Sequence, residues 1–148
     1  MWLVSVRIPR KSLSQINCAA LTPFVLGPAD EEDLERGIAL FNGGKYWEAH
    51  EAWEEIWKRR PEDGRFFLQA LIQLAAAYHQ LEKKVYRGVL IHLKQTQERL
   101  RLFPSDYLRV DVSELLKTVD RSLSAIQSKR SLADVDWNGL EIATIQRA

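Results

Sequence analysis

The chain has 148 residues, 46% of them hydrophobic, and this length suits one domain folded around one core. Charged residues make up 28% of the chain but leave a net charge of only +1, so the overall charge gives no indication of a nucleic acid or a membrane surface as partner. No apolar run reaches the roughly 18 residues of a membrane-spanning helix. The single cysteine, Cys18, excludes an internal disulfide and a cysteine-based zinc site, and it favours a reducing, cytoplasmic location.

Residues 1–29 differ in composition from the rest of the chain. They hold three basic residues and no acidic one, and Pro23, Gly27 and Pro28 interrupt them, so we expect an irregular N-terminal arm. Residues 1–8 alternate in a pattern typical of a short strand, although no second strand is predicted to pair with it. Because the segment contains Ser and Arg and lacks acids, it also resembles an organelle transit segment. A plastid-like location is therefore the alternative.

The spacing of apolar residues predicts five helices between residues 30 and 130, at 30–42, 45–59, 65–83, 86–103 and 112–129. Glycines and prolines separate them, and the connections are short enough to make neighbouring helices antiparallel. Asp30 is the expected N-cap of the first helix, and Asp111 with Glu114 gives the last one a capping box. We therefore expect an all-α, single-domain bundle of about five helices, built from antiparallel helical hairpins.

The remaining segments are assigned by composition. Residues 65–83 are apolar nearly all round, which is typical of a central, buried helix. Gly88 is expected to allow a neighbouring helix to approach closely, and His92 is expected at the surface. Residues 131–148 should form a C-terminal arm that packs on the helical domain. Residues 134–139 resemble half of a calcium loop, but Ile145 stands where the bidentate Glu is needed, so we expect only a turn.

The 45–59 helix carries the side chains that suggest a functional site. Helical spacing places Ala49, Trp53, Ile56 and Trp57 on its buried face, and Glu48, Glu51 and Glu55 on the opposite side. His50 and Glu54 lie on the core side and its margin, one turn apart and within reach of each other.

The buried 65–83 helix offers a partner surface. Gln69, Gln73 and Gln80 share one stripe, and buried amides must find hydrogen-bond partners. We expect His50, Glu54, Gln73 and His79 to converge between these two helices.

Three interpretations of this cluster remain open. His50 and Glu54 are either an oriented pair that fixes the register of the helices, or, with His79, the ligands of a divalent metal. The third interpretation is an organic ligand in a pocket lined by tryptophans. Trp47, on the outer side of its helix, is the best candidate for contact with a partner.

Residues 41–57 read Phe-Asn-Gly-Gly-Lys-Tyr-Trp-Glu-Ala-His-Glu-Ala-Trp-Glu-Glu-Ile-Trp, and residues 67–79 read Phe-Leu-Gln-Ala-Leu-Ile-Gln-Leu-Ala-Ala-Ala-Tyr-His. Over about residues 34–103 the chain resembles the DUF309 family of small helical proteins, whose function is not assigned. The resemblance implies an all-α fold and a bacterial, archaeal or plastid-related origin, but no reaction. It rests on ten positions: Asn42, Gly44, Tyr46, Glu48, His50, Glu51, Trp57, Gln73, His79 and Gly88.

These observations define one candidate site, formed by Tyr46, Glu48, His50, Glu51, Glu54, Trp57, Gln73 and His79. The leading hypothesis is a binding or interaction module that acts on a protein partner or assembles as a homo-oligomer, with no nucleic acid and no membrane involved. The alternative is a metal-dependent, hydrolase-like enzyme centred on His50 and Glu54, with His79 as a further ligand.

Overall fold

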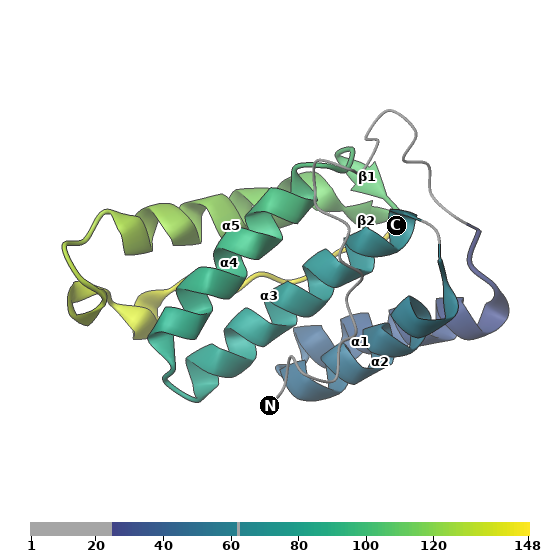
Figure 1. Cartoon of the computed structure of the whole chain (residues 1–148), viewed down its shortest axis with the longest axis horizontal. Coiled ribbons are helices and arrows are strands. Elements are labelled where there is room, and N and C mark those ends of the chain that lie inside the picture. The colour runs from purple at the N-terminus through teal and green to yellow at the C-terminus, as the bar shows by residue number, and fades with distance from the viewer. Residues whose placement is uncertain (1–24, 62) are drawn as a thin grey trace.

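The computed structural model describes residues 25–61 and 63–148, and in this part of the chain five α-helices account for most of the fold (Figure 1). A two-stranded antiparallel sheet joins α4 to α5, and Asp106 pairs with Asp111 in its register. The all-α prediction is confirmed. The expected strand at residues 1–8 lies outside the described residues. The elements are α1 Pro28–Asn42, α2 Tyr46–Arg59, α3 Phe66–Glu82, α4 Tyr86–Leu100, β1 Asp106–Tyr107, β2 Val110–Asp111 and α5 Val112–Gln127.

The helices pack as two hairpins and one added helix. α1 packs on α2, α3 packs on α4, α2 also contacts α3, and α5 rests on α4. Every residue from Phe66 to Tyr78 is buried, so α3 is the central helix, as its apolar sequence predicts. None of the described helices is long and apolar enough to cross a membrane.

A glycine lets α1 and α2 approach closely. A Cβ atom at Gly37 would overlap the indole ring of Trp53, and that indole Nε1 donates a hydrogen bond of 3.4 Å to the Leu34 carbonyl oxygen. The fully buried Trp53 ring therefore fills the space that a side chain at Gly37 would need.

Two helix ends test the predicted caps. The Asp111 side chain accepts a hydrogen bond from the Glu114 backbone N–H at 3.1 Å, which confirms the cap of α5. The prediction for Asp30 was wrong, because α1 begins earlier, at Pro28, whose fixed φ suits the first helical position. Asp30 is instead buried in the first turn, where it accepts a 2.9 Å hydrogen bond from Arg59 Nε.

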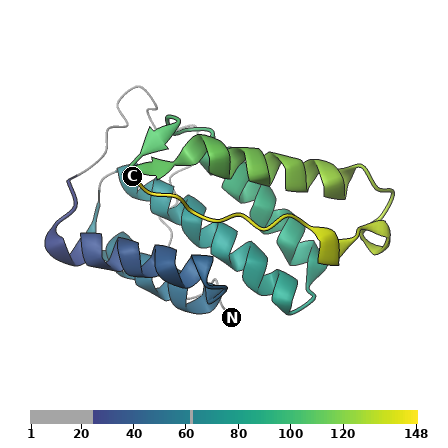
Figure 2. The same cartoon turned by 180° about the vertical axis from the view of Figure 1, so that it is seen from behind.

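The last residues of the chain lie in extended form across α3, between α1 and α5 (Figure 2). Asn42 holds this segment with two hydrogen bonds to the Ile145 backbone, of 3.0 Å from its amide nitrogen and 2.8 Å to its amide oxygen. The Tyr78 hydroxyl accepts a third, of 2.9 Å, from the Ala143 backbone N–H. Residues far apart in sequence thus share one core.

Candidate functional site

His50 and Glu54 form a buried pair on α2. The Nε2 atom of His50 lies 3.0 Å from a carboxylate oxygen of Glu54, and their side chains are only 1% and 6% exposed. The other carboxylate oxygen is 3.3 Å from the Lys58 ammonium, which balances the negative charge of Glu54. These three residues are spaced four apart, so one helical face brings them together.

Burial keeps His50 neutral. Loss of solvent lowers the pKa of His50 to about 4, and the electrostatic effects of His79 and Lys58 act in the same direction. At neutral pH this imidazole is therefore uncharged, and its contact with Glu54 fixes the orientation of its ring.

Trp47 connects this pair to α3. Its ring centroid lies 5.5 Å from that of His50 and 5.6 Å from that of His79, so the indole is flanked by imidazoles from two helices. The Trp47 side chain is still 37% exposed. His50 and His79 therefore contact the same indole. Glu48 and Glu51 are exposed on the outer side of α2, as helical spacing predicts.

Trp57 belongs to the core, and the partly buried Tyr46 packs against it. Tyr46 packs against Phe41 and Tyr78 with ring centroids 5.2 and 5.3 Å apart, and burial raises its pKa. Trp57 is 2% exposed, and the Arg65 guanidinium lies 4.4 Å from its ring centroid. Tyr46 and Trp57 are close to His50 in the sequence because all three residues lie on α2.

The glutamines of α3 face α4, and the expected contact between Gln73 and His50 was wrong. Gln73 Oε1 lies 2.8 Å from His92 Nδ1, and both side chains are buried. His92 was expected at the surface, and this prediction was also wrong. Spacing fixes which residues share a face of a helix, but the face that meets each neighbour depends on how the whole bundle packs.

The same interface contains groups that spacing alone did not identify. With its amide oxygen turned toward Arg99, Gln69 accepts a 3.1 Å hydrogen bond from that guanidinium. A Cβ on Gly88 would lie 3.1 Å from Gln80 Oε1, so this glycine does admit a close neighbour. His92 and Arg99 stand seven residues apart on α4, a spacing that could have revealed their common face.

The metal hypothesis needs three donors. Among residues 25–61 and 63–148, no group of three or more His, Cys, Asp or Glu side chains is arranged to hold a metal ion. His50 and Glu54 are in contact, whereas His50 and His79 each pack against the Trp47 indole. The three-ligand site stays a prediction.

A comparison with family models supports the resemblance seen in the sequence. Residues 34–91 match the model described as Domain of unknown function (DUF309). This stretch contains α2 and α3 complete, and with them every residue of the candidate site. A search of curated proteins found no match.

Proposed function

We propose that this chain, whose residues 34–91 match the DUF309 model, is an interaction module that uses the outer face of α2 to bind a basic protein surface. One observation carries the proposal. Trp47 exposes 37% of its surface although rings from α2 and α3 flank its indole.

An indole in this position is well suited to anchor an interface with a partner. Its orientation is already restricted by the imidazoles of His50 and His79, so binding costs it little side-chain entropy. Tryptophan is among the residues that contribute most to binding energy when a partner covers them. Glu54 then has a positioning role, because its contact with His50 holds one of the two imidazoles that flank Trp47.

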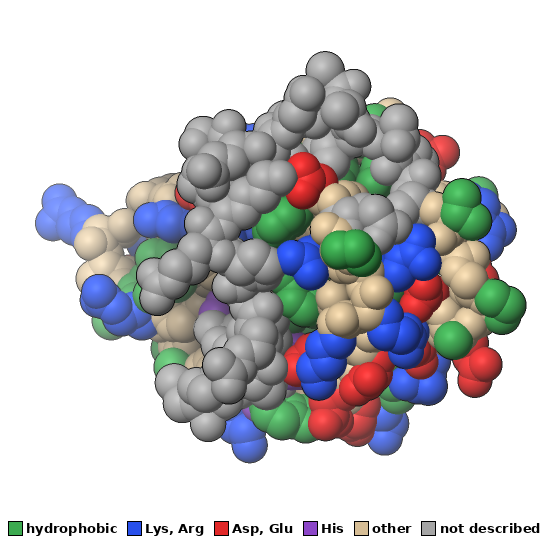
Figure 3. Space-filling model, turned by 45° about the vertical axis from the view of Figure 1, so that its right-hand side comes forward, with side chains coloured by type: hydrophobic (Ala, Val, Ile, Leu, Met, Phe, Trp, Pro, Cys, Tyr) green, Lys and Arg blue, Asp and Glu red, His purple; other side chains and the backbone are tan. Residues whose placement is uncertain are grey.

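The charge beside Trp47 indicates the class of partner. Glu48, Glu51 and Glu55 are exposed on the same helix, and Lys58 Nζ lies 3.9 Å from a carboxylate oxygen of Glu55. Figure 3 shows acidic side chains in red and basic ones in blue gathered at the lower right of one face of the molecule. Acidic rims of this kind attract and orient basic partners and make association depend on salt. The proposed partner therefore combines an apolar socket for the indole with Lys or Arg residues at its edge.

Affinity capture with three forms of the chain tests this proposal. The wild type and Ile91→Ala, which removes an exposed side chain on α4, should retain the same partner, whereas Trp47→Ala should lose it. With that partner purified, Trp47→Ala should weaken binding by roughly 30-fold, about 2 kcal/mol, in calorimetry. Glu51→Lys should slow association more than it speeds dissociation. If every captured protein binds Trp47→Ala and Ile91→Ala equally well, the proposal is wrong.

A further inference from the structure

A second site lies beside the turn between α3 and α4, away from Trp47. A cavity of about 220 Å³ opens there, with apolar walls from Leu81, Tyr86, Trp137 and Ile142 and polar groups from Lys84 and Asn138. The rings of Tyr86 and Trp137 stack with centroids 4.4 Å apart and planes within 6°. In Figures 1 and 2 the short helix Trp137–Gly139, in yellow, lies next to the first turn of α4.

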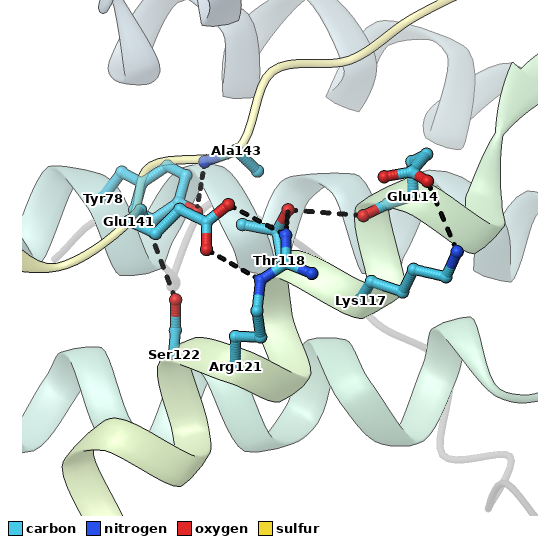
Figure 4. A network of polar contacts seen from close by, with 8 residues as sticks. All are labelled: Tyr78, Glu114, Lys117, Thr118, Arg121, Ser122, Glu141 and Ala143. Carbon is cyan, nitrogen blue, oxygen red and sulfur yellow. Dashed lines mark hydrogen bonds and ion pairs between the residues drawn. The ribbon is translucent and has the colours of Figure 1, made fainter.

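The wall contributed by the C-terminal segment is held in place on both sides of Ile142. Glu141 receives hydrogen bonds of 2.9 Å from Arg121 on each carboxylate oxygen, and its carbonyl accepts one of 3.3 Å from Ser122 (Figure 4). Ala143, on the other side, is bonded to Tyr78. Ile142 remains 42% exposed between these anchors. The cavity is therefore formed before any ligand arrives.

Lys84 occupies a strained position at the edge of this cavity. Its φ angle is +60°, in the left-handed region that disfavours residues with a side chain. The turn between α1 and α2 has the same pattern of hydrogen bonds, from Gly44 N to Phe41 O and from Lys84 N to Leu81 O in the two cases. There the left-handed position is held by Gly44, with φ +81°. Glycine would make the α3–α4 turn without strain.

The charge of Lys84 is not used by the fold. It forms no ion pair with any residue in the described part of the chain, and its side chain is exposed. A strained and exposed residue that forms no ion pair with the described residues points to a role in binding. Because Lys84 lines the cavity and is exposed, its ammonium group is available to an anion whose apolar part enters the cavity.

We propose that this cavity binds a carboxylate carried by a single aromatic ring. The ring would lie against Tyr86 and Trp137, and the carboxylate would accept hydrogen bonds from Lys84 Nζ and the Asn138 amide. A volume of about 220 Å³ is below the roughly 300–1,000 Å³ of sites for drug-sized ligands, which limits the ligand to one ring. Two sources provide this chemistry: a free aromatic acid, or a peptide that ends in an aromatic residue.

Titration of the labelled protein in amide NMR spectra tests the site. Phenylacetate should shift the signals of residues 81–86 and 137–142 with saturation, and the neutral phenylacetamide should bind at least tenfold more weakly. A short peptide ending in phenylalanine, compared with its amidated form, distinguishes the second source. If neither phenylacetate nor the free-acid peptide shifts these signals at millimolar concentration, the proposal is overturned.

Lys84→Gly separates binding from folding. Relief of the strained φ should raise the melting temperature, while loss of the ammonium should weaken binding of the free acid at least tenfold. Lys83→Gln removes a neighbouring charge that does not line the cavity, and its affinity should stay within twofold of the wild type. Equal affinity in Lys84→Gly and the wild type would contradict the assigned role of Lys84.

Discussion

His50 illustrates how far a single residue can be predicted. Its buried position and its contact with Glu54 follow from helical spacing, and both are found. Its partner on α3 does not follow, because Gln73 pairs with His92 instead. Spacing along one helix is a local property, whereas the choice between two neighbouring helices depends on the packing of all three.

The titration of His50 gives a prediction at the same scale. Its pKa is about 4 in the folded protein and about 6.5 in the unfolded chain, so between these values the unfolded state binds more protons. The contribution to stability is complete above pH 6.5 and is lost as the pH falls toward 4. It amounts to about 3 kcal/mol at most. Urea unfolding at pH 7 and pH 4.5 should show this loss.

His50→Gln is the control for this experiment, because a neutral amide cannot take up the proton. The variant should keep only the part of the pH dependence that comes from other groups. His92 is one of these, since burial lowers its pKa as well. If His50→Gln and the wild type lose the same stability between pH 7 and pH 4.5, the titration of His50 is not the cause of the loss.

At the scale of the elements, two helices pack closely where one of them carries a residue without a side chain. Gly37 on α1 is the clearest case. Gly37→Ala replaces glycine by the best helix former, which by propensity alone would stabilise α1 by up to about 1 kcal/mol. Because the added methyl group would overlap the Trp53 indole, we expect instead a loss of about 1–3 kcal/mol in the free energy of unfolding.

Denaturant midpoints measure this effect. Gly27→Ala is the matched control, because a Cβ at Gly27 would meet nothing within 4 Å. Its midpoint should fall by less than that of Gly37→Ala, since replacing a glycine N-cap by alanine costs up to about 1 kcal/mol and causes no steric overlap. A Gly37→Ala protein as stable as this control would mean that α1 and α2 can separate without cost.

At the scale of the whole molecule, Asn42 joins the end of the first hairpin to the end of the chain. Asn42→Ala removes both hydrogen bonds to Ile145 and leaves the backbone N–H and C=O of Ile145 without these partners. We therefore expect a loss of about 1–3 kcal/mol in the free energy of unfolding. Amide hydrogen exchange of Ile145 and Ala143 should become faster, whereas exchange in α3 should change only as much as global stability does.

Gln127→Ala, an exposed change at the end of α5, should leave exchange of these amides unaltered. Equal protection of Ile145 in Asn42→Ala and in Gln127→Ala would show that other contacts hold the segment. Among the positions that carry the family resemblance, two thus have structural roles: Asn42 holds the C-terminal segment, and Gly44 takes the left-handed conformation in the turn between α1 and α2.

The sequence alone determined the helices, the central place of α3, the cap of α5 and the shared face of His50 and Glu54. Each of these depends on residues within about one or two turns, so local spacing and capping chemistry are sufficient. Tertiary structure decided that the glutamines of α3 meet α4, that Asp30 pairs with Arg59 rather than capping α1, and that Tyr86 stacks on Trp137. These contacts join residues 19 to 51 positions apart, and their geometry is set by the simultaneous packing of several elements.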